Sequence, residues 1–448
     1  MRELFGTDGI RGKANEFPMT PELCMKLGKA IALSFRNGKP SPKIVIGKDT
    51  RISGYMLETA LTSGLVSMGA TVLLVGPMPT PAISHLTRSL NADAGIVISA
   101  SHNHAMDNGI KVFDSLGYKL SDEMEKRVEG IIFSNEMEAG ELNGSSIGKA
   151  FRVDDAKGRY VEFAKSSINN RSLSGLKVVV DCANGAAYRV APEVLSELGA
   201  HTIVMNNLPD GLNINLGCGA TSVEGLSRRV VEEKADLGLA FDGDADRLIV
   251  VDSKGNEING DRIMAALALD LKSRNALNNN SVVATVMSNS GFEQFMNRNG
   301  INVVRTKVGD RYVIEEMRRN NYNFGGEQSG HIIFGEYSTT GDGLITALQI
   351  LKLVKDKGKT VSELCNGFDI FPQVLVNVSV REKKPLEEIA SVAEAIRAAD
   401  SRLAGNGRVL VRYSGTENIA RVMVEGQDES EIREIAGSVA RTIAGELS

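Results

Sequence analysis

The chain has 448 residues, of which 42% are hydrophobic and 24% charged, and its formal net charge is -5 at pH 7. These values are ordinary for globular proteins and give no general attraction to nucleic acid or to an anionic membrane, so we expect neither as a partner. The length exceeds what one hydrophobic core organises and predicts three or four domains.

The cysteines and the N-terminus indicate the compartment. The four cysteines lie far apart, without a CxxC pair, which predicts reduced structural thiols rather than disulfides or a zinc site. The opening stretch "MRELFGTDGIRG" carries charges and glycines where a signal peptide needs an apolar run. No later run reaches the ~18 apolar residues of a membrane span. We therefore expect a cytoplasmic protein.

In chain order, short β-branched runs alternate with helical periodicity. The predicted elements are a helix at 54–68 and strands at 43–47, 71–76, 94–99, 176–181, 201–205, 237–241, 281–286 and 301–306. This alternation is typical of parallel α/β architecture. Beyond Phe371 the pattern changes to strands at 373–380, 408–412 and 420–426, with helices near 385–404 and from about 429. These elements predict a smaller α+β domain.

The α/β stretches look like three weak copies of one unit. "MGATVLLVG" from Met68 echoes "LGAHTIVMN" from Leu198 and, more faintly, "NGINVVRTK" from Asn299. Two copies then reach "ADAGIVISAS" and "ADLGLAFDGD", so Ser101 and Asp244 fall at equivalent positions just past a strand. In the third copy "YNFGGEQSGH" takes that position. Because α/β sheets bind ligands beyond the carboxyl ends of parallel strands, we expect the three loops to share one cleft.

The fold class that follows is α/β, with three similar domains on mixed or parallel sheets and a smaller C-terminal α+β domain around a central cleft. The predicted domains are 1–150, 151–254, 255–370 and 371–448.

The acidic stretch "FDGDADR" is the sharpest chemical motif. Asp242, Asp244 and Asp246 alternate with small residues directly after a strand, so a tight loop can turn their carboxylates toward one hard cation. Oxygen-only ligation without Cys or His favours Mg²⁺ over Zn²⁺. A solvated acidic turn remains the alternative, although clustered carboxylates repel one another unless a cation joins them.

Ser101 in "ISASHN" is a candidate nucleophile. A serine hydroxyl is weakly reactive, so it needs a base, a metal or prior phosphorylation. We expect no triad with His102, because neighbouring side chains in extended backbone point to opposite faces. Lys111 is close enough in sequence to neutralise phosphate oxygens. Taken alone, such a polar junction between a strand and a helix is more often a helix cap.

Two further loops suit recognition of a sugar phosphate. In "VRYSGTENIAR" a permissive turn flanked by arginines can form an anion nest, and a plain hairpin turn is the alternative. Its candidate residues are Arg412, Ser414, Gly415, Thr416 and Arg421. "GGEQSGH" offers Glu327, Ser329 and His331 for sugar hydroxyls or an amine. A surface turn is the alternative there.

Together, "FGTDGIRG", "GKDTRISG", "SASHN", "DGDADR", "GGEQSGH" and "RYSGTEN" resemble the α-D-phosphohexomutase superfamily, in family order from Phe5 to about Glu425. The resemblance implies a phosphoserine at Ser101 and Mg²⁺ held by the three aspartates and a phosphate oxygen on that serine. It also implies a sugar loop at Glu327 to Ser329 and a distal phosphate loop at Arg412 to Thr416 with Arg421. Candidates for support of phosphoryl and proton transfer are Arg11, Lys111, Arg247 and His331.

Within the superfamily, "GEQSGH" and "KVGDRYV" look more like the glucosamine branch than the phosphomannomutase/phosphoglucomutase branch, which stays the alternative. The implied reaction interconverts glucosamine 6-phosphate and glucosamine 1-phosphate through glucosamine 1,6-bisphosphate, and supplies precursors of the cell envelope. We expect a monomer or a homodimer.

Three residues depart from the family pattern. His104 stands where Pro is usual and should loosen the serine turn, and Asn418 stands where many members have Pro. Ala245 stands where Gly is common, which should be tolerated only if its φ stays below zero.

Two rival functions remain open on sequence grounds. One is an aspartyl phosphotransferase, whose first loop aspartate would be the nucleophile. The other is a sugar-phosphate sensor without catalysis.

Overall fold

The computed structural model describes residues 4–6, 8–36, 38, 41–134, 136, 143–403, 407–413 and 418–447. The chain divides into two compact units, which are described separately. The first unit comprises Met1–Met287 and Val303–Cys365, and the second comprises Ser288–Asn302 and Asn366–Ser448.

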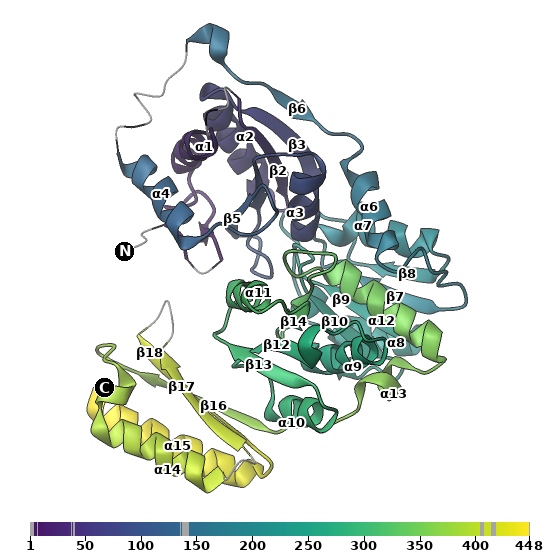
Figure 1. Cartoon of the computed structure of the whole chain (residues 1–448), viewed down its shortest axis with the longest axis vertical. Coiled ribbons are helices and arrows are strands. Elements are labelled where there is room, and N and C mark those ends of the chain that lie inside the picture. Colours follow the sequence, from purple (N-terminus) through teal and green to yellow (C-terminus); the bar gives the residue numbers. More distant parts are fainter. Residues whose placement is uncertain are drawn as a thin grey trace. The chain divides into compact units, whose positions relative to one another are not determined.

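The first sheet of the first unit contains six strands in the order β1-β5-β4-β2-β3-β6 (Figure 1). Its strands are β1 (Ile10–Lys13), β2 (Lys43–Lys48), β3 (Thr71–Pro77), β4 (Ala94–Ile98), β5 (Asp107–Asp114) and β6 (Ala150–Arg152). Its helices are α1 (Pro21–Phe35), α2 (Ser53–Ser67), α3 (Thr80–Ser89) and α4 (Asp122–Phe133). Helices α1 and α2 pack closely, since a Cβ on Gly64 would lie 2.1 Å from the carbonyl oxygen of Met25.

A second sheet has the order β11-β10-β9-β7-β8 and a third the order β13-β12-β14-β15. The second is built from β7 (Lys177–Asp181), β8 (His201–Met205), β9 (Leu237–Phe241), β10 (Leu248–Asp252) and β11 (Glu257–Ile258), with α6 (Ala156–Ser166), α7 (Ala187–Glu197) and α8 (Glu224–Glu233). The third is built from β12 (Ser281–Thr285), β13 (Asn302–Thr306), β14 (Phe324–Gly326) and β15 (Ile332–Phe334), with α9 (Gly260–Ser273), α11 (Asp310–Arg319), α12 (Gly343–Lys357) and α13 (Val361–Cys365).

These three sheets share one arrangement of strands, which fixes where their loops lie. Strands β4, β9 and β14 each pair in parallel with the first strand of their copy, β2, β7 or β12. Each also pairs antiparallel with the strand that follows it, β5, β10 or β15. The loops 99–106, 242–247 and 327–331 therefore occupy equivalent positions, as the sequence repeats predict.

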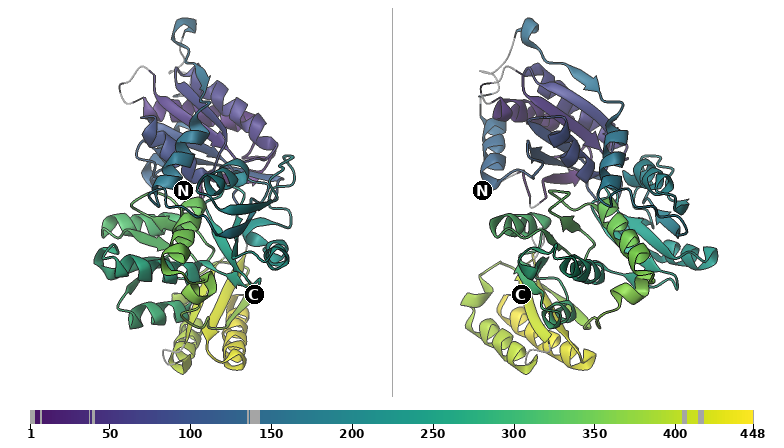
Figure 2. Two further views of the ribbon diagram at one scale, coloured as in Figure 1. Left: turned by 90° about the vertical axis from the view of Figure 1, so that its right-hand side faces the viewer. Right: turned by 45° about the vertical axis from the view of Figure 1, so that its right-hand side comes forward.

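The second unit contains an antiparallel sheet of order β16-β18-β17 and helices on one of its faces (Figures 1 and 2). Its elements are β16 (Gln373–Ser379), β17 (Gly407–Tyr413), β18 (Ile419–Gly426), α10 (Ser290–Arg298), α14 (Ala390–Leu403) and α15 (Glu429–Leu447). Apolar side chains of the sheet, α14 and α15 form a separate core, which includes Val392, Val422 and Ile435.

The structure confirms the predicted fold class of three α/β sheets with a smaller C-terminal α+β part, and the predicted strands lie within one or two residues of those observed. The serine loop leads into strand β5 rather than into a helix, so the helix-cap alternative for Ser101 is wrong. None of the described helices has the length and apolar character needed to cross a lipid bilayer.

Candidate active site

Ser101 lies against the acidic loop of the second sheet. Its hydroxyl donates a hydrogen bond of 2.7 Å from Oγ to Asp242 Oδ2, and only 1% of the residue is exposed. The hairpins after β4 and β9 carry these two residues at equivalent edges of their own sheets, and the hydrogen bond joins the serine of the first copy to a carboxylate of the second.

The backbone of Ser101 is left-handed, with φ at 52°. This conformation costs an ordinary L residue roughly 1–2 kcal/mol and persists only where surrounding contacts enforce it. It also corrects the expectation for His102. The left-handed turn brings His102 Nδ1 to 3.3 Å from Ser101 Oγ, instead of sending the two side chains to opposite faces. Burial, reinforced by Arg247 and Arg11, lowers the pKa of His102 to about 4.

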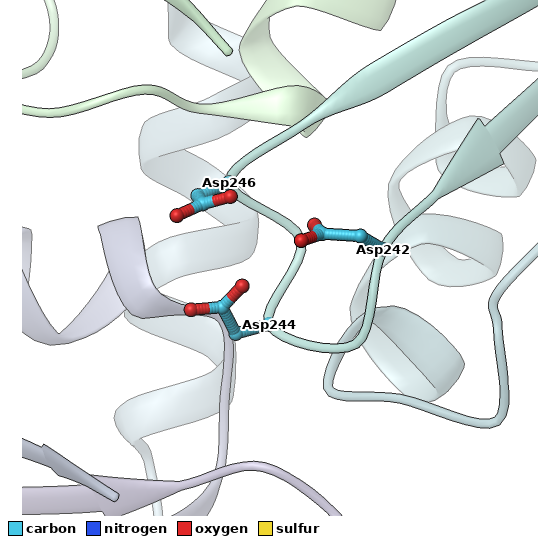
Figure 3. A group of neighbouring side chains, drawn as sticks. All are labelled: Asp242, Asp244 and Asp246. Atoms are coloured by element: carbon cyan, nitrogen blue, oxygen red, sulfur yellow. The ribbon is translucent and has the colours of Figure 1, made fainter. Parts of the chain in front are cut away.

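The three loop aspartates point toward one common space (Figure 3). One oxygen of each lies within 4.8 Å of the others, and all three residues are buried. Burial and the two neighbouring carboxylates raise the pKa of Asp242 well above its ordinary value. Buried Oδ1 atoms of Asp244 and Asp246 have no hydrogen-bond partner in the described part of the chain. Three clustered carboxylates, two of them with an oxygen that accepts no hydrogen bond, offer the hard oxygen ligands that a divalent cation requires, so the residues fit a metal site.

Ala245, inside this loop, contradicts the sequence expectation. Its φ is +56°, not negative. The loop reverses direction at this residue, where Ala245 N donates to Asp242 O at 3.0 Å and Gly343 N donates to Ala245 O at 3.1 Å. These two hydrogen bonds hold the left-handed conformation that glycine would adopt without strain.

Lys111 supplies a buried positive charge beside the aspartates. Its Nζ lies 3.0 Å from Asp244 Oδ2, 3.5 Å from Asp246 Oδ2 and 3.2 Å from Asp8 Oδ2. Burial alone would lower the pKa of Lys111, but Asp244 and Asp8 raise it well above the ordinary value. The same ion pair and Thr80 lower the pKa of Asp244, although burial opposes them. Lys111 is therefore a permanent cation suited to phosphate oxygens.

His331 connects the third loop to this cluster. Its Nε2 lies 3.4 Å from Asp310 Oδ2 and 3.7 Å from Asp246 Oδ2. Lys119 forms ion pairs with both Asp310 and Asp8. Burial would raise the pKa of Asp310, but Lys119 and His331 lower it. The sequence reasoning assigned no role to Asp8, Lys119 or Asp310. Asp8 and Asp310 lie inside quoted motifs, whereas Lys119 lies in none.

The remaining predicted residues of the first unit surround this centre. Arg11 pairs with Asp8, and the backbone N–H of Arg247 donates to Asp242 Oδ1 at 3.2 Å. Glu327 Oε1 accepts from the backbone N–H of Gly309 at 3.2 Å, and Ser329 Oγ is buried without a hydrogen-bond partner in the described ranges. The turn at His104 is closed by a 3.1 Å hydrogen bond from Asp107 N to His104 O, and the looser turn expected from the absence of Pro stays a prediction.

The arginines of the distal loop lie in the second unit. Arg412 on β17 and Arg421 on β18 stand directly opposite each other in the register. Burial and the charge of Arg421 lower the pKa of Arg412. Like charges that face each other across a sheet are unfavourable unless an anion joins them. Ser414, Gly415 and Thr416 lie outside the described residues.

Four family models match the chain in order. They describe the phosphoglucomutase/phosphomannomutase alpha/beta/alpha domain I (residues 2–139), domain II (158–255), domain III (259–371) and C-terminal domain (375–442).

Similar proteins extend over the whole length. A phosphoglucosamine mutase of Geotalea daltonii is 54% identical over 450 residues, covering 99% of both chains, and one of Myxococcus xanthus is 52% identical over 448 residues, covering 100% of this chain and 98% of that protein.

Two solved structures share the fold. A phosphoglucomutase/phosphomannomutase family protein of Burkholderia thailandensis has a TM-score of 0.82 at 24% identity, covering 99% of this chain and 97% of that one. The Aspergillus fumigatus N-acetylphosphoglucosamine mutase has a TM-score of 0.69 at 18% identity, covering 100% and 96%. The chain therefore belongs to the phosphoglucomutase/phosphomannomutase family, as its resemblance to the α-D-phosphohexomutase superfamily predicts.

Proposed function

We propose that the chain interconverts glucosamine 6-phosphate and α-D-glucosamine 1-phosphate through a phosphoserine at Ser101 and glucosamine 1,6-bisphosphate. The observation that carries the proposal is the 2.7 Å hydrogen bond that joins Ser101 Oγ to the carboxylate cluster. The choice of an amino sugar is supported by relatives more than 50% identical over nearly the full length, which are named phosphoglucosamine mutases.

Mg²⁺ is the proposed cofactor, held by Asp242, Asp244 and Asp246 together with a phosphate oxygen on Ser101. Two buried carboxylate oxygens that accept no hydrogen bond from the described residues and the raised pKa of Asp242 support this assignment, and a ligand set made only of oxygens suits a hard cation. When bound, Mg²⁺ supplies positive charge that stabilises the transferring phosphoryl group.

The transfer itself exchanges one P–O bond for another. The bond from phosphorus to Ser101 Oγ breaks, a bond to a free sugar hydroxyl oxygen forms, and the proton of that hydroxyl leaves while Oγ gains one. His102 Nδ1, at 3.3 Å, is in reach to accept a hydrogen bond from the restored Oγ hydroxyl, and because its pKa is lowered to about 4 the proton that Oγ gains comes from solvent. Lys111 stays charged and binds phosphoryl oxygens, with Arg11 and Arg247 in support. His331 is the proposed group for the proton of the sugar hydroxyl.

Reversal of the same step on the bisphosphate returns its other phosphate to Ser101, so a second phosphate site is needed. We assign that site to Arg412, Arg421 and the turn from Ser414 to Thr416. The facing arginines support it, because a bound phosphate would relieve their repulsion and Arg binds phosphate in a bidentate manner. Glu327 and Ser329 are assigned to the sugar.

The proposal is tested with purified protein, Mg²⁺ and a trace of the matching bisphosphate. We expect kcat/KM to be higher for glucosamine 1-phosphate than for glucose 1-phosphate or mannose 1-phosphate. Ser101→Ala should be inactive, whereas Ser63→Ala on α2, a serine exposed to solvent, should match the wild type. Activity of Ser101→Ala at the wild-type level would refute the serine role.

Substrate preference and hydroxylamine treatment distinguish the proposal from the phosphomannomutase/phosphoglucomutase alternative and from an aspartyl phosphotransferase. A preference for mannose or glucose phosphates would favour the phosphomannomutase/phosphoglucomutase alternative. Hydroxylamine removes an acyl phosphate but leaves a phosphoserine intact, so phosphate released by hydroxylamine would indicate an aspartyl enzyme instead.

The proposal extends to organisation and location. The predicted domains are 1–150, 151–254, 255–370 and 371–448. The four family models support them, because each model begins and ends within 11 residues of a predicted domain (150 against 139 at the widest). A reducing cytoplasm is supported by the four cysteines, which are buried free thiols. A monomer or homodimer is proposed, and light scattering measures which.

A further inference from the structure

A closed ring of hydrogen bonds holds both backbone groups of Ser101. The N–H of Ser101 donates to Ser99 Oγ at 2.9 Å, and Ser99 Oγ donates to Asp49 Oδ2 at 2.6 Å. The same carboxylate oxygen accepts from Arg51 Nε at 2.8 Å, and Arg51 Nη2 donates to the carbonyl oxygen of Ser101 at 2.9 Å. With its N–H and its carbonyl both held, Ser101 cannot change its φ angle without breaking the ring.

Arg51 extends this hold over the whole serine loop. Its Nη2 also donates to Asn103 O at 2.9 Å, and its Nη1 donates to His104 O and to Asp107 O. The Arg51 side chain has no exposed surface. A planar guanidinium directs five N–H groups in fixed directions, which a lysine ammonium cannot reproduce. Arg51 thus binds three carbonyl groups of the serine loop, a fourth at the first residue of β5, and the carboxylate of Asp49.

Asn215 approaches the same loop from the second sheet. Its Nδ2 donates to Ser101 O at 2.9 Å and to Asn103 O at 3.0 Å, the two carbonyls that Arg51 Nη2 also binds. Gly243 of the acidic loop packs against this pair. A Cβ there would lie 2.5 Å from Ser101 O and 2.7 Å from Asn215 Nδ2. The amide of Asn215 therefore fixes the position of the serine loop relative to the loop that carries Asp242.

We propose that Arg51 and Asn215 are positioning residues for phosphoryl transfer, because together they clamp the carbonyls of Ser101 and Asn103 and so hold the left-handed backbone that aims the serine hydroxyl at Asp242. The inference rests on the proposed function, since it assumes that Ser101 carries the transferred phosphate. Strained backbone at a reacting group persists where the surroundings fix it, and here two loops provide the fixing contacts.

The sharpest test removes the amide of Asn215 without straining the backbone. Asn215 has φ at 57°, which glycine adopts freely, so Asn215→Gly deletes both clamp hydrogen bonds and leaves the Arg51 ring in place. Asn215→Asp keeps the size but loses both donors. We expect either change to lower kcat about 10²-fold at an unchanged KM, as for a misplacement of about 1 Å at the reacting group.

Asn91→Gly is the matched control, because Asn91 is exposed, has φ at 50° and makes no contact with the clamp. It should behave as the wild type. Arg51→Lys keeps the charge but not the geometry and should also lower kcat. If Asn215→Gly and Asn215→Asp lower only the melting temperature, with kcat per folded molecule unchanged, the residues are merely structural and the proposal fails.

A second readout separates this inference from the identity of the sugar. The rate at which Ser101 takes up phosphate from glucose 1,6-bisphosphate, followed by intact mass, should fall in the Asn215 variants as kcat does. If the wild type takes up phosphate but does not isomerise glucosamine phosphates, the proposed function fails while the clamp is still judged by the uptake rates. If wild-type Ser101 takes up no phosphate, both proposals fall.

Discussion

The position of His331 depends on the absence of a side chain at Gly341. A Cβ on Gly341 would lie 2.5 Å from both Cε1 and Nε2 of the imidazole, well inside van der Waals contact. The ring is buried, with Asp310 and Asp246 on its Nε2 side. Because interiors are close-packed, the ring cannot move aside without disturbing these contacts.

Gly341→Ala should therefore displace His331 and lower kcat by about 10 to 10²-fold, together with an overpacking cost of about 1–3 kcal/mol. Gly335→Ala is the control, since its new Cβ would meet its neighbours at 3.4 Å or more, an ordinary contact. Steady-state kinetics and urea unfolding measure the two effects. Equal behaviour of the two variants would show that the Gly341 contact does not position His331.

At this scale the sequence predicted side chains better than backbone conformation. Asp242, Asp244, Asp246 and Ser101 were recognisable because their residue types and their place after a strand carry chemical meaning. The left-handed conformations of Ser101 and Ala245 were not, because neither residue type favours positive φ and hydrogen bonds from distant segments impose it. Lys119 was missed because nothing local distinguishes it from other lysines.

At the scale of elements, the alternation of apolar runs predicted the parallel strands well. The antiparallel partners β5, β10 and β15 were not predicted, because the direction of a strand depends on its neighbour and not on its own residues. This omission explains why the serine loop was expected to lead into a helix.

Helix α12 begins at a carboxylate whose burial gives it a measurable pH dependence. Asp342 caps the helix by accepting from Ile345 N at 2.9 Å, and its two oxygens accept from the buried Tyr160 hydroxyl at 2.9 Å. Burial raises the pKa of Asp342 from 3.8 to about 6, although these hydrogen bonds oppose the shift. A pKa above the unfolded value means that the folded state binds the proton more tightly. The contribution of Asp342 to stability is therefore full below pH 3.8 and is lost as the pH rises through about 6.

Asp342→Asn should remove this dependence, because an amide oxygen can still accept from Ile345 N and Tyr160 but carries no charge. The unfolding free energy of the variant minus that of the wild type should rise by up to about 3 kcal/mol as the pH increases from below 3.8 to above about 6, because the pKa of Asp342 differs by roughly two units between the folded and unfolded states. Urea unfolding from about pH 4 to about pH 7 measures it. A difference that stays flat, or falls, with pH would show that Asp342 titrates normally.

At the scale of the whole chain, sequence order and compact units differ. Helix α10 follows β12 in the chain, yet Ser288–Asn302 belongs to the same compact unit as Asn366–Ser448. Buried contacts explain this. Glu425 on β18 accepts from Ser290 N at 2.6 Å, and the Asn289 side chain bonds to both backbone groups of Phe371. No periodicity in the sequence reveals such an attachment, since it joins residues more than 80 positions apart.

Because each unit has its own apolar core, the chain should unfold in two calorimetric transitions. All three loop aspartates lie in the first unit. Mg²⁺ at 100 times its dissociation constant should therefore increase the unfolding free energy of that unit by about 2.7 kcal/mol and raise only that unit's transition temperature. Asp244→Asn should abolish the rise. Glu425→Ala, which removes a buried carboxylate of the second unit, should lower the other transition and leave the response to Mg²⁺ intact. A single transition would mean that the two units do not unfold separately. A rise with Mg²⁺ that survives Asp244→Asn would mean that the aspartates do not hold the cation.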